Sequence, residues 1–193
     1  MKIIGVGCGP GMLTEQAIRE ISRAVVIYGS DRAIDLAKSY IPIDCTVKTI
    51  DDFKHLKKLP ENAVILSTGD PMLAGLGYLS GEVIPGISSF QLATARLKIP
   101  VSRVSVIVAH GKGHEKGMQD TMREVKTGKI VFLLADPKFN VQDLYARLAT
   151  LPIPLKIALC ENLGYPDECI LVRDIQSPPQ PTEALYSLVI GNF

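Results

Sequence analysis

A glycine-rich turn directly follows a short apolar strand pattern at the start of the chain, in residues 3–11 (IIGVGCGPG). Glycine tolerates positive φ angles, and its missing side chain lets a ligand approach the main chain closely. With the helical pattern that begins at Thr14, the segment predicts a β-strand, a tight turn and an α-helix in succession. The turn itself is either an ordinary β-to-α connection or a ligand-binding loop.

The spacing of these glycines differs from the dinucleotide-binding fingerprint G-x-G-x-x-G. A fingerprint that started at Gly5 would place Pro10 on its last glycine, and one that started at Gly7 would place Met12 there. Pro10 also has no N–H group, so the turn lacks the continuous row of donors that binds a pyrophosphate. If the loop binds a ligand, we therefore expect a ligand other than a dinucleotide.

Length and charge limit the partners that the chain can have. Its 193 residues can form one or two domains, and a hydrophobic share of 47% with 21% charged residues is ordinary for a globular protein. The net charge of +1 gives no basic footprint for nucleic acid or for an anionic membrane surface. Because the sequence has no secretory leader pattern and no apolar run of about 18 residues, we expect a cytoplasmic protein.

The cysteine and histidine patterns predict neither a disulfide framework nor a metal site. His110 and His114 have the spacing of two ligands on one helix face, but Gly111 and Gly113 make a helix unfavourable there. The cysteines are scattered without a C-x-x-C pair, which is typical of reduced thiols. They are Cys8, Cys45, Cys160 and Cys169.

Strand-like and helix-like patterns alternate along the chain, which predicts an α/β fold of two domains. For a first domain, residues 1–110, the patterns predict strands at 2–6, 24–28, 46–50, 63–67, 82–84 and 102–108, and helices at 14–22, 31–39, 52–59 and 88–97. For a second, more mixed domain, residues 111–193, they predict helices at 118–125 and 141–149 and strands at 129–134, 156–159, 168–173 and 185–190. The segment 110–117, rich in glycine, lysine and histidine, marks the predicted boundary.

Two further loops follow predicted strands. The first, residues 69–75 (GDPMLAG), places Asp70 at the carboxyl edge of the predicted sheet, where ligands of open α/β sheets bind. Asp70 either binds ammonium or hydroxyl groups of a ligand or caps the turn that follows it. The second, residues 85–90 (PGISSF), offers the hydroxyls of Ser88 and Ser89 at a helix start, either as N-caps or as contacts to a carboxylate or a ribose.

The residues assemble no Ser/His/Asp set, no Cys/His set and no telling pair of carboxylates. The sequence therefore indicates a binding architecture in which a cofactor carries the chemistry, and it identifies no catalytic side chain.

Together, and in this order, the three loops resemble those of the tetrapyrrole methylases. The resemblance extends over nearly the whole chain and implies two α/β domains with a cleft between them that binds S-adenosylmethionine. It implies that the loop from Gly9 to Gly11 forms the floor on which a macrocycle meets the methyl group, with Gly9 and Pro10 among the cofactor-binding residues. Cofactor contacts are implied for Asp70, Leu73, Ser88 and Ser89 and for the main chain of Leu134 and Ala135.

Later stretches, residues 83–93, 109–111 and 161–168, resemble the branch of the family that methylates C5 of a corrin precursor in cobalamin biosynthesis. That branch implies a separate decarboxylating partner that methylates C15. The segment 78–81 is shorter than in relatives, which either opens the cleft on that side or leaves that side to a second copy of the chain. The carboxylates of a tetrapyrrole would need basic partners, for which Arg96, Arg103, Lys112 and Lys116 are candidates.

Three other interpretations stay open at this point. The chain could be another member of the same superfamily, such as a methyltransferase for an earlier precorrin or a diphthine synthase. It could be a nucleotide-binding oxidoreductase that holds a ribose with Asp31, which lies near the end of the second predicted strand. It could also be a binding module without catalytic activity.

Overall fold

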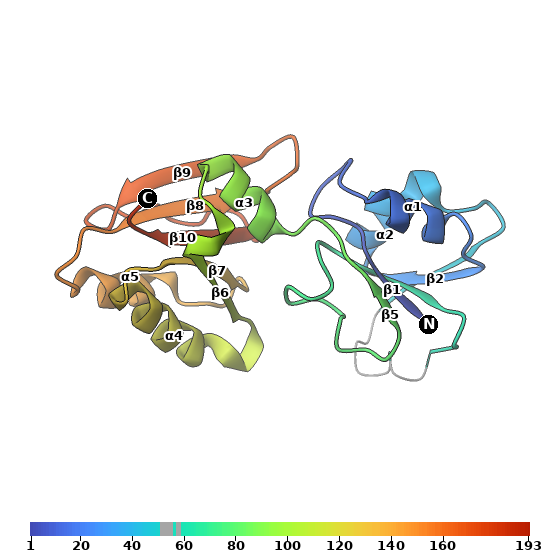
Figure 1. Cartoon of the computed structure of the whole chain (residues 1–193), viewed down its shortest axis with the longest axis horizontal. Coiled ribbons are helices and arrows are strands. Elements are labelled where there is room, and N and C mark those ends of the chain that lie inside the picture. The colour runs from blue at the N-terminus through green and yellow to red at the C-terminus, as the bar shows by residue number, and fades with distance from the viewer. Residues whose placement is uncertain (51–55, 57–58) are drawn as a thin grey trace. The chain divides into compact units, whose positions relative to one another are not determined.

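The computed structural model describes residues 1–50, 56 and 59–193 and divides the chain into two compact units, Met1–Ser88 and Ser89–Phe193 (Figure 1). This division comes earlier than the boundary predicted at residue 110. The strand β6 (Val104–Ala109) pairs in parallel with β7 (Ile130–Ala135) and so opens the second sheet instead of closing the first. An α/β pattern alone does not tell which of two sheets a strand joins.

The first unit contains a five-stranded sheet in the order β3-β2-β4-β1-β5, and all of its strands are parallel. The strands are β1 (Lys2–Gly5), β2 (Val26–Gly29), β3 (Thr46–Thr49), β4 (Val64–Ser67) and β5 (Glu82–Ile84). Parallel strands end at the same edge of a sheet. The three loops identified in the sequence therefore all leave the sheet at its carboxyl edge.

Alternate residues of the central strands face two apolar layers, because successive side chains point to opposite faces. Ile4 and Leu66 pack with α1 (Glu15–Ile21) and α2 (Asp31–Ala37) on one face. Ile3 and Ile65 pack on the other face with Leu56, Leu76 and Leu79. Thr14 caps α1 by accepting a hydrogen bond from the Ala17 N–H at 3.1 Å. Most of the helix predicted at 52–59 lies outside the described residues.

The segment between β4 and β5 consists of turns and bends, and Ala74 within it has a φ of 104°. A side chain at that angle is strained, whereas glycine is not. We expect Ala74→Gly to raise the free energy of unfolding by about 1 kcal/mol in urea denaturation. Ala95→Gly, at an exposed position inside the helix α3 (Ser89–Leu97), is the matched control and should lower it by about the same amount. A loss of stability in both variants would contradict the strain at Ala74.

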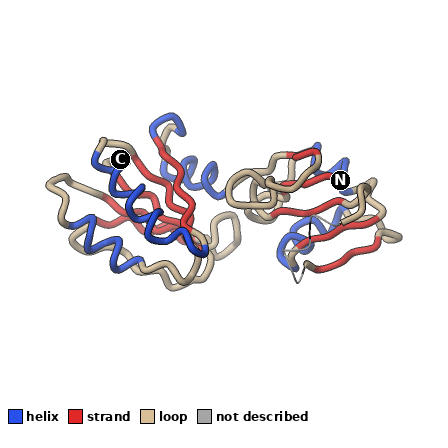
Figure 2. The backbone as a smooth tube through the Cα atoms, turned by 90° about the horizontal axis from the view of Figure 1, so that it is seen from below, coloured by secondary structure: helices blue, strands red, loops and turns tan. Residues whose placement is uncertain are grey.

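The second unit is built on a mixed sheet, drawn in red with the other strands in Figure 2. Its strands follow the order β6-β7-β10-β8-β9. Its other strands are β8 (Lys156–Glu161), β9 (Cys169–Asp174) and β10 (Tyr186–Gly191). The strand β9 pairs antiparallel with β8. The helices α4 (His114–Lys126) and α5 (Val141–Ala149) pack on one face. On the opposite face Phe90 of α3 meets Phe132 edge to face, with ring centroids 5.5 Å apart.

The helix α4 begins at His114, earlier than the predicted start at residue 118, and a short 3-10 turn at Gly111–Gly113 leads into it. Glycines disfavour helical structure by themselves, but here the Gly111 N–H and the His114 ring are both bound by Asp136. A tertiary anchor therefore offsets the low helix propensity. Among the residues that the structure describes, no helix combines the length and the apolar composition needed to cross a bilayer.

Candidate functional site

The glycine-rich turn and the loop after β4 are joined to each other at the carboxyl edge of the first sheet. The Gly7 N–H donates to the Gly69 carbonyl at 3.2 Å, and the Gly69 N–H donates back to the Gly7 carbonyl at 2.8 Å. Both glycines have positive φ angles, of 80° and 70°. The two loops thus form a short antiparallel bridge that only residues without a Cβ accommodate easily.

The third loop approaches the same point at main-chain distance. A Cβ atom at Gly5 would lie 2.5 Å from the Gly86 nitrogen and 2.8 Å from the Gly69 carbonyl oxygen. A Cβ atom at Gly86 would overlap with the Gly69 carbonyl oxygen and lie 2.8 Å from the Gly5 carbonyl carbon. The three loops are therefore interlocked through glycines, a contact that sequence spacing alone does not show.

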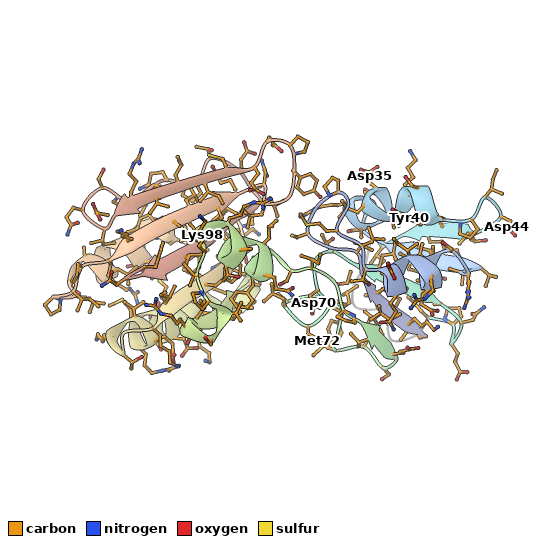
Figure 3. All side chains as sticks on the ribbon, turned by 45° about the horizontal axis from the view of Figure 1, so that its top comes forward. Asp35, Tyr40, Asp44, Asp70, Met72 and Lys98 are labelled. Carbon is orange, nitrogen blue, oxygen red and sulfur yellow. The ribbon has the colours of Figure 1, made fainter. Side chains whose placement is uncertain are left out.

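Asp70 ties the loops together with its carboxylate (Figure 3). Its Oδ1 accepts from the Met72 N–H at 2.8 Å, and its Oδ2 accepts from the Gly86 N–H at 3.0 Å. The first bond is the turn cap that the sequence allowed, and the second joins the loop after β5. Because each carboxylate oxygen can accept more than one hydrogen bond, these two bonds leave acceptor capacity for a ligand.

The other expected contact residues of the first unit lie on the same loops. Leu73 is half-buried, Ser88 is buried, and Ser89 begins α3 as the first residue of the second unit. In the glycine-rich turn, Gly9 is buried and Pro10 is exposed.

Arg32 was missed by sequence reasoning and contacts the glycine-rich turn. Its Nη2 donates to the Cys8 carbonyl at 3.0 Å, from a position 24 residues along the chain. The neighbouring Asp31, a candidate ribose ligand, instead accepts a hydrogen bond from the Thr49 hydroxyl at 3.0 Å. Its position just after a strand of the parallel sheet could have indicated that Arg32 lies near the site. The sequence could not show that its partner is the Cys8 carbonyl.

The second unit repeats the arrangement of Asp70 at Asp136. Like Asp70, this residue follows a buried strand and precedes a proline. Its Oδ1 accepts from the Lys138 N–H at 2.9 Å, and its Oδ2 accepts from the Gly111 N–H at 2.6 Å. Each aspartate thus caps its own turn with one carboxylate oxygen. With the other oxygen, Asp70 accepts from a glycine in the loop after β5, and Asp136 accepts from a glycine in the loop after β6.

His114 adds to the Asp136 cluster, which directly follows Leu134 and Ala135 in the chain. The His114 Nε2 lies 2.9 Å from the Asp136 Oδ2, and the ring packs edge to face on Phe139. Asp136 directly follows Ala135, which is buried, while Leu134 is half-buried. His114 is therefore hydrogen-bonded to the Asp136 carboxylate, just after the end of β7. In the described part of the chain, no three His, Cys, Asp or Glu side chains lie close enough together to form a metal site.

The hydrogen bond from His114, and then that from the Gly111 N–H, hold the pKa of the Asp136 carboxyl well below its usual value of about 3.9. A carboxyl with a depressed folded-state pKa stabilises the fold above its unfolded pKa, and this contribution is lost as the pH falls. We expect Asp136→Asn to lower the urea midpoint at pH 7, with a difference from wild type that shrinks below about pH 4. Asp44→Asn controls for loss of one exposed carboxylate. A difference that stays constant down to pH 3 would contradict this role of Asp136.

The basic residues that were candidates for binding tetrapyrrole carboxylates all belong to the second unit. Two of them form ion pairs with acidic side chains, and a third lies away from Asp136. Arg96 pairs with Glu168 at 2.6 Å, and Lys116 pairs with Asp120. Arg103 precedes β6 and so lies at the opposite edge of the sheet from Asp136. The side chain of Lys112 lies outside the described residues.

Two buried side chains lie near the end of β8, at the edge of the second sheet where β7 also ends. Glu161, at the end of β8, is 4% exposed and accepts from the Thr182 N–H at 2.6 Å and the Glu183 N–H at 2.8 Å. Cys160 is buried beside it, and desolvation raises the pKa of its thiol to about 12. A thiol in that state is a poor nucleophile, and Glu161 is committed to the following loop.

The described residues therefore assemble loops, main-chain groups and carboxylates that suit binding rather than acid, base or nucleophilic catalysis. In each unit, an aspartate after a strand end orders a glycine-bearing loop. Such a site can orient two reactants whose own reactivity supplies the chemistry.

Comparison with known proteins agrees with this architecture over most of the chain. The chain is 32% identical over 190 residues to a probable cobalt-precorrin-7 C(5)-methyltransferase of Methanocaldococcus jannaschii, a match that covers 89% of this chain and 88% of that protein. It is 29% identical over 130 residues to a decarboxylating precorrin-6Y C(5,15)-methyltransferase of a Sinorhizobium species, which covers 58% of this chain and 30% of that protein.

A solved structure shows the same arrangement of elements. The crystal structure of a cobalamin biosynthesis precorrin-6Y methylase from Archaeoglobus fulgidus has a TM-score of 0.76 to this chain at 29% identity, over 99% of this chain and 96% of that one. The sequence profile of the tetrapyrrole (corrin/porphyrin) methylases matches residues 2–178. The chain belongs to the tetrapyrrole methylases.

Proposed function

We propose that the protein transfers a methyl group from S-adenosylmethionine to C5 of cobalt-precorrin-7 in cobalamin biosynthesis. The observation that carries this proposal is the set of three interlocked glycine loops at the carboxyl edge of a parallel sheet, in a chain of this family. The relative from Methanocaldococcus jannaschii, matched along most of its length, supports the choice of corrin substrate and of ring carbon.

The residues of the loops fit the chemical groups of S-adenosylmethionine. The cofactor carries an ammonium group and ribose hydroxyls, which a carboxylate such as that of Asp70 binds, and Ser88 and Ser89 offer hydroxyls at the neighbouring loop. Within the glycine-rich turn, a Cβ at Gly11 would meet nothing within 4 Å, so the main chain there is open to a ligand. We assign Asp70, Leu73, Ser88 and Ser89 to the cofactor, with Leu134 and Ala135 as the contribution of the second unit. Gly9 and Pro10 are assigned to the floor beneath the macrocycle.

The proposed reaction asks for orientation rather than for a catalytic side chain. When bound, S-adenosylmethionine supplies an electrophilic methyl group on a good leaving group, and a reduced tetrapyrrole is itself an electron-rich carbon nucleophile. The loops then need to hold the two reactants in line and to exclude water, which supplies about 7–11 kcal/mol of the barrier in well-oriented reactions. The absence of a nucleophile from the described site residues is therefore compatible with catalysis.

We also propose partners and a location. A separate decarboxylating protein would methylate C15, because the chain matches only part of the relative whose name includes both positions. We place the protein in the cytoplasm, because its four cysteines form no disulfide and thiols stay reduced in that compartment.

A second copy of the chain would cover the turn segment after β4, which carries Met72 (Figure 3). There Met72 and Tyr78 are 71% and 59% exposed. Large apolar side chains that cluster on one exposed segment mark contact surfaces. We expect light scattering to report a dimer for the wild type and a monomer for the double variant Met72→Glu, Tyr78→Glu. Ile43→Glu, at a fully exposed apolar residue elsewhere in the first unit, should stay dimeric. A monomeric wild type would refute the dimer.

Methyl transfer to a panel of corrin intermediates tests the proposed function. Incubation with labelled S-adenosylmethionine should place the label on the intermediate that lacks the C5 methyl group and on no earlier precorrin. Transfer to an earlier precorrin would reassign the protein within its family, and transfer to a diphthamide precursor would make it a diphthine synthase.

Calorimetry separates the remaining alternatives. We expect S-adenosylhomocysteine to bind and NAD not to bind. Tight NAD binding would favour an oxidoreductase. Binding of S-adenosylhomocysteine without turnover of any panel member would favour a non-catalytic binding module.

A further inference from the structure

Among the described residues, His114 is the only side chain that hydrogen-bonds the Asp136 carboxylate. The His114 Nε2 lies 2.9 Å from Oδ2, which also accepts from the Gly111 N–H at 2.6 Å. The other oxygen, Oδ1, accepts from the Lys138 N–H at 2.9 Å. The side chains of His114 and Asp136 are 25% and 20% exposed, so their hydrogen bond is partly shielded from water. Loss of this bond would remove one of the three donors that orient the carboxylate.

The main chain around Asp136 lies just beyond the paired part of β7. The pairing of β7 with β10 ends at Leu134, and its pairing with β6 ends at Ala135. Past these ends, the Asp136 carbonyl accepts from the Phe139 N–H at 3.0 Å and from the Tyr186 hydroxyl at 3.4 Å. The last peptide groups of β7 are therefore held by the contacts of Asp136 as well as by the sheet.

Leu134 and Ala135 are the residues of the second unit that we assign to the cofactor. We propose that His114 is a positioning residue for this contact. By holding the Asp136 carboxylate, it fixes the preceding main chain of β7 in the conformation that binds S-adenosylmethionine. Without the bond, only a fraction of the molecules would present that conformation, and the apparent affinity would fall by the same fraction. This inference rests on the proposed function and adds to it a residue that acts through another.

Two substitutions separate the hydrogen bond of His114 from its ring contact. His114→Phe keeps a ring that can pack edge to face on Phe139 but has no N–H, whereas His114→Gln keeps an N–H donor without the ring. We expect calorimetry to show that S-adenosylhomocysteine binds about tenfold more weakly to His114→Phe and with nearly wild-type affinity to His114→Gln. The reverse order would assign the effect to ring packing and would refute the proposal.

A cycle of single and double variants tests whether His114 acts through Asp136. Once the carboxylate is removed by Asp136→Ala, the histidine has nothing to hold. His114→Phe should therefore weaken S-adenosylhomocysteine binding by less than about twofold in that background, against about tenfold in the wild type. Losses that multiply in the double variant would show that the two residues act independently and would refute this route.

Controls separate positioning from a general loss of stability. His110→Gln removes a histidine of the same segment whose exposed ring makes no hydrogen bond or ion pair with the residues that the structure describes, and it should bind like the wild type. Ala95→Gly lowers stability at an exposed position of α3 and should also keep wild-type affinity. All variants are compared at a temperature at which circular dichroism shows them folded. His114→Asn, whose shorter amide cannot take the place of Nε2, is a second variant without the donor and should bind like His114→Phe.

The outcomes separate this inference from the proposed function. If the wild type does not bind S-adenosylhomocysteine, the proposed function is wrong, and this inference is wrong with it. If the wild type binds it and both His114→Phe and His114→Asn bind it equally well, the proposed function stands and the role of His114 is refuted. In methyl transfer, the two variants should raise KM for S-adenosylmethionine and leave kcat nearly unchanged, because His114 is not assigned to the reacting atoms.

Discussion

Gly86→Ala is expected to disrupt the interlocked loops and to abolish cofactor binding. The new Cβ would overlap with the Gly69 carbonyl oxygen and lie within 3 Å of the Gly5 carbonyl carbon and Cα. All three are main-chain atoms, which move less easily than the end of a flexible side chain. Overpacking against side chains costs about 1–3 kcal/mol, and main-chain neighbours yield less easily, so we expect a loss of about 3 kcal/mol in the free energy of unfolding. Chemical denaturation and calorimetry with S-adenosylhomocysteine measure the two effects.

Gly113→Ala is the matched control for this substitution. Gly113 has a φ of −87°, and the nearest heavy atom to a Cβ there is the Val108 carbonyl oxygen at 4.0 Å. That variant should fold and bind S-adenosylhomocysteine like the wild type. If Gly86→Ala also kept wild-type stability and affinity, the close approach of Gly5, Gly69 and Gly86 would not be required.

Asp70→Ala is expected to weaken S-adenosylhomocysteine binding by about 100-fold. The change removes the acceptor of the Gly86 and Met72 N–H groups as well as the proposed contact to the cofactor. A hydrogen bond to a charged group contributes about 1.5–3 kcal/mol, and each 1.4 kcal/mol is a factor of ten in affinity. Because Gly86 is buried, its N–H cannot turn to solvent without movement of the loop.

Asp70→Asn keeps part of each task of the side chain. The amide has one acceptor oxygen, so one of the two loop N–H groups loses its acceptor and the negative charge is lost; we expect an affinity and a stability between those of Asp70→Ala and the wild type. Asp35→Ala, at an exposed carboxylate of the same unit, is the control and should change neither quantity (Figure 3). Wild-type affinity in Asp70→Ala would remove Asp70 from the cofactor site.

Local patterns predicted elements in both units and the three loops of the first unit well. The helix at Val141–Ala149 and the strand at Glu82–Ile84 have the predicted bounds. The α/β fold is confirmed as well. The expected contacts of Asp70, Leu73, Ser88 and Ser89 remain proposals, since no ligand contact has been observed.

Contacts between distant segments were beyond sequence reasoning. Asp136 stands in the same context as Asp70, after a strand and before a proline, but its partner Gly111 lies 25 residues earlier. Arg32 and Cys8 are similarly separated. Such pairs depend on which strands become neighbours. Strand pairing also explains why the chain divides after Ser88 and not at the predicted residue 110. Because β6 pairs with β7, it belongs to the second unit.

A crystal structure with bound S-adenosylhomocysteine tests the central claim most directly. The account predicts that the ligand contacts Asp70, Leu73, Ser88 and Ser89 together with the main chain of Leu134 and Ala135, and that its sulfur atom points toward Gly9 and Pro10. A ligand bound away from the three glycine loops, or one whose sulfur atom points away from the glycine-rich turn, would contradict it.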